Sequence, residues 1–199
     1  MKIISITSLF LATVTATPAP EVHKKRDPGW EAPFNAITMR VMKQNPPREE
    51  YLQAYKSRFW IGGMPSTWYP DGQGPGIDET VLQGGRIDSL SVSVEGGQHL
   101  YIDPDGALRY TTPSNPEPPP GSYMGDMNYA FDWVFVPNQP GTWWWACPNP
   151  EERDSYCQLF APFENITVPG VNDPTILCYK ADVAGFEYKG KTPVTYMYT

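Results

Sequence analysis

The sequence predicts an all-β protein, a single β-sandwich or barrel-like domain with Pro/Gly-rich loops. Its 23 prolines and 17 glycines are spread along the 199 residues, between short runs rich in valine, isoleucine, tyrosine, phenylalanine and tryptophan. Turn residues that alternate with short β-branched and aromatic runs are typical of all-β domains. The sequence contains no internal repeat and no domain-splitting linker, so one domain is expected.

The clearest local signal is a β-hairpin at residues 96–111. Its centre, Asp103-Pro104-Asp105-Gly106, lies between two runs in which apolar residues alternate. Proline fixes φ at the first central position of a turn and glycine accepts the left-handed conformation after it, so a tight turn is predicted here. The two aspartates also resemble the start of a calcium loop, but no glutamate follows at the distance that a complete loop requires. The turn is the favoured interpretation.

Other elements follow from shorter patterns. Residues 90–94 alternate with period two, which predicts that Leu90, Val92 and Val94 face inward. After two prolines, residues 48–56 (REEYLQAYK) are expected to form the one short helix, and residues 113–121 (PSNPEPPPG) a surface loop. Further strands are expected at residues 58–61, 131–136, 142–146, 156–160, 166–168, 176–183 and 194–198.

The N-terminus predicts export. Residues 1–16 read as a signal peptide: one positive charge precedes an apolar run from Ile3 to Val14, followed by small residues. That run is shorter than the roughly 20 residues of a membrane-spanning helix, so a membrane anchor is the less favoured alternative. Residues 17–26 are expected to be a propeptide ending in the dibasic pair Lys25-Arg26, with the secreted β-domain at residues 27–199. An ordinary charged linker remains the alternative to a propeptide.

Charge narrows the classes of partner. Removal of residues 1–26 takes away four basic residues and one acidic residue, which leaves 11 basic against 21 acidic residues and a net charge of −10. A surface of this sign repels phosphate backbones and anionic lipids, so neither a nucleic acid nor a membrane is expected as a partner. The charge suits solubility in an extracellular medium.

The sequence does not predict an enzyme. His99 is the one histidine after residue 26, and a Ser-His-Asp arrangement would need a nucleophile beside it; an ordinary strand residue is expected instead. One histidine and three cysteines without C-x₂-C or H-x₃-H spacing predict no zinc site, and no cofactor is expected. Glycoside hydrolysis needs only two facing carboxylates, and no pair is singled out, so a small glycosidase stays a distant alternative.

Aromatic residues suggest a different activity. Seven tryptophans and twelve tyrosines invite a carbohydrate-binding interpretation, because aromatic faces stack on sugar rings. On a strand, Trp143 and Trp145 would share one face and Trp144 would take the other, so at least one face should be core. Trp144 is the candidate glycan-stacking residue, with packing beneath a loop as the alternative. The remaining candidates, Trp60, Trp68 and Trp133, are expected to be core or loop-anchoring residues.

Two modifications are expected on the exported chain. Asn165-Ile166-Thr167 is the sole N-x-[ST] sequon, so Asn165 is predicted to be N-glycosylated. The three cysteines pass through an oxidising pathway, where pairing is expected, and three leave one over.

Several segments together resemble the fungal PhiA-type secreted cell-wall proteins, which include IgE-binding allergens. Their order and spacing follow that family from about residue 58 to residue 178. The matching segments are FWIGG (59–63), ETVLQGG (79–85), LSVSVEGGQHLYIDPDGALRY (90–110), PPGSY (119–123), ACP (146–148), QLFA (158–161) and NITVP (165–169).

The resemblance implies a non-enzymatic protein, secreted to the medium or the cell wall, with a link to asexual development and wall architecture and with wall polysaccharide as a candidate partner. It implies no catalytic residues. It places a disulfide between Cys147 and Cys178 and leaves Cys157 as a buried thiol; an exposed Cys157 that joins two molecules is the alternative. A secreted glycan-binding module and a host-directed effector remain the alternatives.

Overall fold

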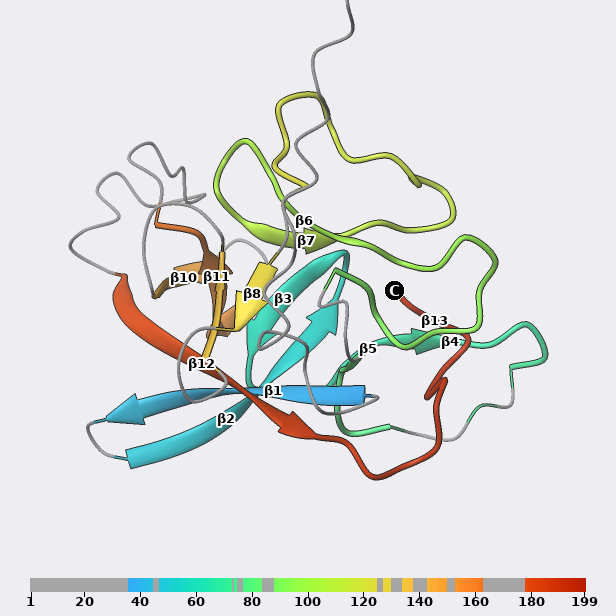
Figure 1. Ribbon diagram of the computed structural model, residues 1–199, viewed down its shortest axis with the longest axis horizontal. Helices are drawn as coiled ribbons and strands as arrows, with labels where there is room; N and C mark the ends of the chain where they lie inside the picture. Colours follow the sequence, from blue (N-terminus) through green and yellow to red (C-terminus); the bar gives the residue numbers. More distant parts are fainter. Residues whose placement is uncertain are drawn as a thin grey trace, which may run out of the picture.

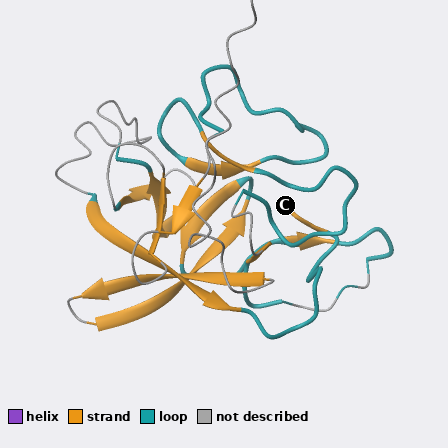
Figure 2. Ribbon diagram, viewed as in Figure 1, coloured by secondary structure: helices purple, strands orange, loops and turns teal. Residues whose placement is uncertain are grey.

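The computed structural model describes residues 36–44, 47–72, 74, 77–83, 88–124, 127–129, 134–137, 143–149, 153–162 and 178–199. These residues form thirteen β-strands and no helix, which confirms the predicted all-β class (Figure 2). Within these ranges, no helix is long and apolar enough to cross a membrane. The predicted signal peptide, Lys25-Arg26, Trp133, the strand at 166–168 and Asn165 lie outside the described residues.

Six antiparallel strands close into a barrel. The hydrogen-bonded order is β1–β2–β3–β11–β10–β12, and β12 pairs back with β1 (Figure 1). Closure leaves no open edge along this circuit. The strands are β1 (Ala36–Gln44), β2 (Pro47–Tyr55), β3 (Arg58–Ile61), β10 (Trp144–Asn149), β11 (Arg153–Phe160) and β12 (Tyr179–Glu187).

Seven further strands lie around the barrel. β5 (Val81–Gln83) pairs with the start of β1. β9 (Val134–Pro137) pairs with β12 on one side and with β8 (Met127–Tyr129) on the other. The hairpin of β6 (Leu100–Ile102) and β7 (Leu108–Tyr110) attaches to β3. A separate two-stranded ribbon, β4 (Thr67–Trp68) with β13 (Met197–Tyr198), lies beside the barrel and contains the C-terminal end of the chain (Figure 1).

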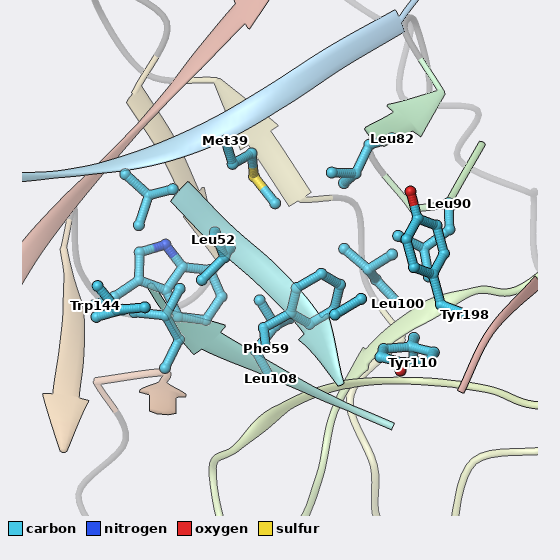
Figure 3. Close-up of a cluster of buried hydrophobic side chains, with 14 of the residues drawn as sticks. Met39, Leu52, Phe59, Leu82, Leu90, Leu100, Leu108, Tyr110, Trp144 and Tyr198 are labelled. Carbon is cyan, nitrogen blue, oxygen red and sulfur yellow. The ribbon is translucent and has the colours of Figure 1, made fainter. Parts of the chain in front are cut away.

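One continuous core fills the barrel and extends under the loops. Strand alternation sends Met39, Leu52, Phe59 and Trp144 into it, and each is fully buried (Figure 3). Beyond the barrel the same core continues beneath the loop-rich side of the molecule, through Leu82, Leu90, Leu100, Tyr110 and Tyr198. The core therefore ties the β4–β13 ribbon to the barrel.

The predicted helix at residues 48–56 is wrong, because this segment is strand β2. Leu52 and Ala54 alternate into the core, and β2 pairs with β1 on one side and β3 on the other. These pairings and the burial of one face outweigh the local helix preference of the segment. A two-residue turn, Lys56-Ser57, follows; both residues have positive φ, 50° and 59°, as a tight hairpin turn requires.

The structure agrees with most of the other local predictions, namely the hairpin turn, the buried side chains of residues 90–94 and the surface loop. The hairpin turn is confirmed: the Gly106 amide donates to the Asp103 carbonyl at 2.8 Å, and Gly106 has φ 91°. Leu90, Val92 and Val94 are buried as predicted, although Leu90 and Val92 form isolated bridges and no strand is present here. Residues 113–121 form the expected surface loop. Predicted strands differ at their ends, since β9 runs on to Pro137, β10 to Asn149 and β12 to Glu187, while β13 covers Met197–Tyr198 alone.

Candidate functional site

Trp144 is not available to a ligand. Its side chain points into the barrel and is 0% exposed, so the interpretation of Trp144 as a glycan-stacking residue is wrong. It lies opposite Ala181 on β12, and small neighbours such as Ala146 leave the barrel room for one indole. On the outer face, Trp145 packs against the disulfide, and Trp143 lies beneath the Lys180 ammonium, 4.1 Å from the ring centroid.

His99 contacts two residues that precede it in the chain, Ser89 and Gly96. Its Nε2 lies 3.0 Å from the Gly96 carbonyl oxygen, and its Nδ1 lies 3.0 Å from Ser89 Oγ. The structure thus brings a hydroxyl to the imidazole, a contact that the sequence did not predict. Ser89 is itself buried and its hydroxyl also donates to Asp88 Oδ1 at 3.1 Å. One ring nitrogen thus contacts a backbone carbonyl and the other a side-chain hydroxyl, which is the geometry of a structural histidine.

Asp103 and Asp105 are engaged by the turn and by one guanidinium. Asp105 Oδ1 accepts from the Ala107 amide at 2.8 Å, and its Oδ2 accepts from Arg109 at 3.0 Å. Arg109 Nε lies 2.7 Å from Asp103 Oδ2. Burial raises the pKa of Asp103, and Arg109 opposes that shift. The described residues contain no cluster of three or more His, Cys, Asp or Glu side chains that could hold a metal.

The disulfide joins β10 to the start of β12. Cys147 and Cys178 are bonded, with an S–S distance of 2.04 Å, which is the pairing that the family resemblance implies. Ala107, Phe160 and Trp145 surround it on the outer face of the barrel. The bridge closes a loop between residues 31 positions apart.

Cys157 lies on the other face of the sheet. On β11 it is opposite Ile61 and packs against the barrel core, whereas its neighbour Gln158 is opposite Cys147. Alternation of side chains along a strand therefore separates the Cys157 thiol from the disulfide. The thiol is half-buried rather than fully buried. Burial raises the pKa of the adjacent Tyr179, and Cys157 acts in the same direction.

Among the described residues, the exposed large aromatic side chain is Trp68, on the β4–β13 ribbon. Trp68 is 45% exposed and is therefore not a core residue, whereas Trp60 is fully buried as expected. The Trp68 ring meets Tyr196 edge to face, with centroids 5.5 Å apart and an interplanar angle of 64°. We call these two side chains the Trp68–Tyr196 pair. Edge-to-face contacts of this kind stabilise an aromatic pair and fix its orientation.

The ribbon beneath this pair is held firmly. The Thr199 amide donates to the Ser66 carbonyl at 2.9 Å, and the two hydroxyls of these residues lie 2.7 Å apart. Gln98 is fully buried: its Oε1 accepts from the Tyr198 amide at 2.7 Å, and its Nε2 donates to the carbonyls of Tyr198 and Thr111 at 2.9 and 3.0 Å. Trp68 thus stands on a rigid element although it is exposed.

A turn follows Trp68 directly. The Gly72 amide donates to the Tyr69 carbonyl at 3.1 Å, and Gly72 has φ 69°, a conformation that favours glycine. The turn presents Pro70 and Asp71, both exposed. The Tyr69 hydroxyl donates inward, to the Val194 carbonyl at 3.2 Å. Apolar ring surface and hydrogen-bonding groups therefore lie within a few residues of each other on this ribbon.

These features define a small all-β protein: a closed antiparallel barrel with one disulfide in its described residues. A sequence comparison identifies the family to which the protein belongs. The chain is 34% identical over 173 residues to an uncharacterized secreted protein of the fungus Arthroderma benhamiae, covering 81% of this chain and 86% of that protein. The chain belongs to this family of secreted fungal proteins, and it is itself secreted. No known family profile and no solved structure matches it.

Proposed function

We propose that this protein is a non-enzymatic component of the fungal cell wall or cell surface, of the PhiA type, that contributes to wall architecture during asexual development. The observation that carries the proposal is its kinship with a secreted fungal protein over most of both chains. The segments that resemble PhiA-type proteins support it, since they contribute to β3, β10 and β11 of the barrel, to the 96–111 hairpin and, through Cys147, to the disulfide.

The placement of reactive side chains also favours a structural or binding role. His99 is bound to Gly96 and Ser89, and the aspartates of the hairpin turn are bound to Arg109. These polar groups already have partners within the fold, whereas a general acid or base must be able to reach a substrate proton.

Fractionation of a producing culture tests the proposal. Antibody detection would follow the protein in the medium, in detergent extracts of the wall and in material released only by wall-degrading enzymes. A substantial share in the two wall fractions is expected, together with altered walls on asexual spores of a deletion strain. A protein confined to the medium, with normal walls in the deletion strain, contradicts the proposal. Hydrolysis of wall glycans by the purified protein would instead favour the glycosidase alternative.

A further inference from the structure

We infer that the Trp68–Tyr196 pair is a binding platform for a neutral glycan of the fungal wall. The inference deepens the proposed function and rests on it, because wall polysaccharide is what a protein in that location meets. The chemistry that recognises such a ligand is the apolar C–H face of a β-linked sugar ring, which packs on an aromatic ring, while its hydroxyls bond to polar groups around the rim.

The amount of exposed apolar surface fits a sugar better than a protein partner. Among the described residues, three large hydrophobic side chains are exposed, Met64 at 52%, Trp68 at 45% and Met124 at 58%. Of these, Trp68 alone is aromatic and belongs to a strand. A stable protein interface needs about 800 Å² on each partner, whereas one indole has roughly the area of one sugar ring. The pair is therefore a contact for one ring of a chain.

The pair is also preorganised. Tyr196 fixes the orientation of the Trp68 ring, and Gln98 and the Ser66–Thr199 contacts hold the two strands. Little side-chain freedom then remains to be lost on binding, which lowers the entropic cost of association. The net charge of the whole chain, −7, favours a neutral polymer over an anionic one.

Polar groups complete the platform. Asp71 is exposed on the turn that follows Trp68, where its carboxylate can accept hydrogen bonds from sugar hydroxyls. Thr199 ends the ribbon, and its hydroxyl, which lies 2.7 Å from that of Ser66, can also donate or accept a hydrogen bond. An aromatic face with a few convergent polar groups is the usual composition of a sugar-binding surface.

Binding of the purified mature protein to two polymers tests the inference. The probes are insoluble β-1,3-glucan and chitin in sedimentation assays, with laminarihexaose and chitohexaose in calorimetry to separate the two sources. Trp68→Ala should bind at least about tenfold more weakly, the loss that corresponds to 1.4 kcal/mol. Trp68→Phe should keep most of the affinity, because it keeps an aromatic face. Met124→Ala is the matched control: it removes another exposed apolar side chain, from a loop outside the ribbon, and should bind as the wild type does.

Several results would overturn the inference. Binding of Trp68→Ala within twofold of the wild type would do so, as would failure of the wild type to bind either polymer. A dimer that dissociates on Trp68→Ala substitution, seen by analytical ultracentrifugation, would make the pair a protein interface instead. The proposed function is tested separately: a protein found in the wall but unable to bind either polymer refutes the platform alone, whereas one that binds both polymers yet stays in the medium refutes the wall location.

Discussion

Gln98→Glu should destabilise the protein far more than a change of one amide to one carboxylate usually does. Gln98 is fully buried and makes three hydrogen bonds, two of them as a donor to the carbonyls of Thr111 and Tyr198. The substitution keeps the shape of the side chain but removes both donor hydrogens. Each carbonyl then loses its buried partner at a cost of about 1–3 kcal/mol, so the free energy of unfolding should fall by about 2–6 kcal/mol.

That loss is a large part of the total free energy of unfolding of a domain, which is roughly 5–15 kcal/mol. Gln83→Glu is the matched control, because Gln83 is exposed on β5, and its effect should stay within about 0.5 kcal/mol. Urea unfolding followed by circular dichroism at pH 7 measures both variants. Equal stability of the two variants would refute the role assigned to Gln98.

The stability of Gln98→Glu should also depend on pH, and the direction of the change can be derived. Burial should raise the pKa of the introduced carboxyl above its unfolded value of about 4.3. Protonation then favours the folded state, so the deficit relative to the wild type should be smallest near pH 4 and should grow as the pH rises to 7. A deficit that does not change over this range would mean that the introduced carboxyl is not buried.

The remaining predictions concern covalent structure. Replacing both Cys147 and Cys178 with alanine should cost about 3.7 kcal/mol in the loop-entropy model for a separation of 31 residues, and should lower the melting temperature by about 7–15 °C, whereas Cys157→Val should be nearly neutral. A peptide that links Cys157 to Cys178 in a non-reducing map would contradict this assignment. N-glycosidase should lower the mass of the secreted protein, and Asn165→Gln should abolish that shift; an unchanged mass in both cases rules out the glycan. Sequencing of secreted protein should find Asp27 at the N-terminus, and a dominant start at Thr17 would exclude the propeptide.

The sequence predicts those parts of the fold that depend on neighbouring residues. The turn of the 96–111 hairpin could be identified because Pro104 and Gly106 each have one strong conformational preference. The inward positions of Leu90, Val92 and Val94 follow from alternation alone. Barrel closure could not be predicted in this way, because it depends on the pairing of β1 with β12, far away in the chain.

The strand β2 shows how a local preference can mislead. Residues 48–56 contain several helix-forming residues, and the turn after them carries no Asn-Gly or Asp-Gly signal of the kind that identifies a hairpin. Lys56 and Ser57 adopt positive φ all the same, because Tyr55 and Arg58 are paired on either side of them. Long-range pairing thus determines both the strand and its turn.

The tryptophans mark the limit of what the sequence predicts about the candidate site. Alternation correctly separates Trp144 from Trp143 and Trp145, but it cannot tell which face of the strand is the inner one. Closure of the barrel decides this, because it places Trp144 opposite Ala181 in the interior. The position of Trp68 could not be predicted from any pattern, because its strand has only two residues, too few to show a period. Its partner Tyr196 lies near the other end of the chain. An aromatic platform assembled from two such distant segments can be recognised only once the fold has brought them together.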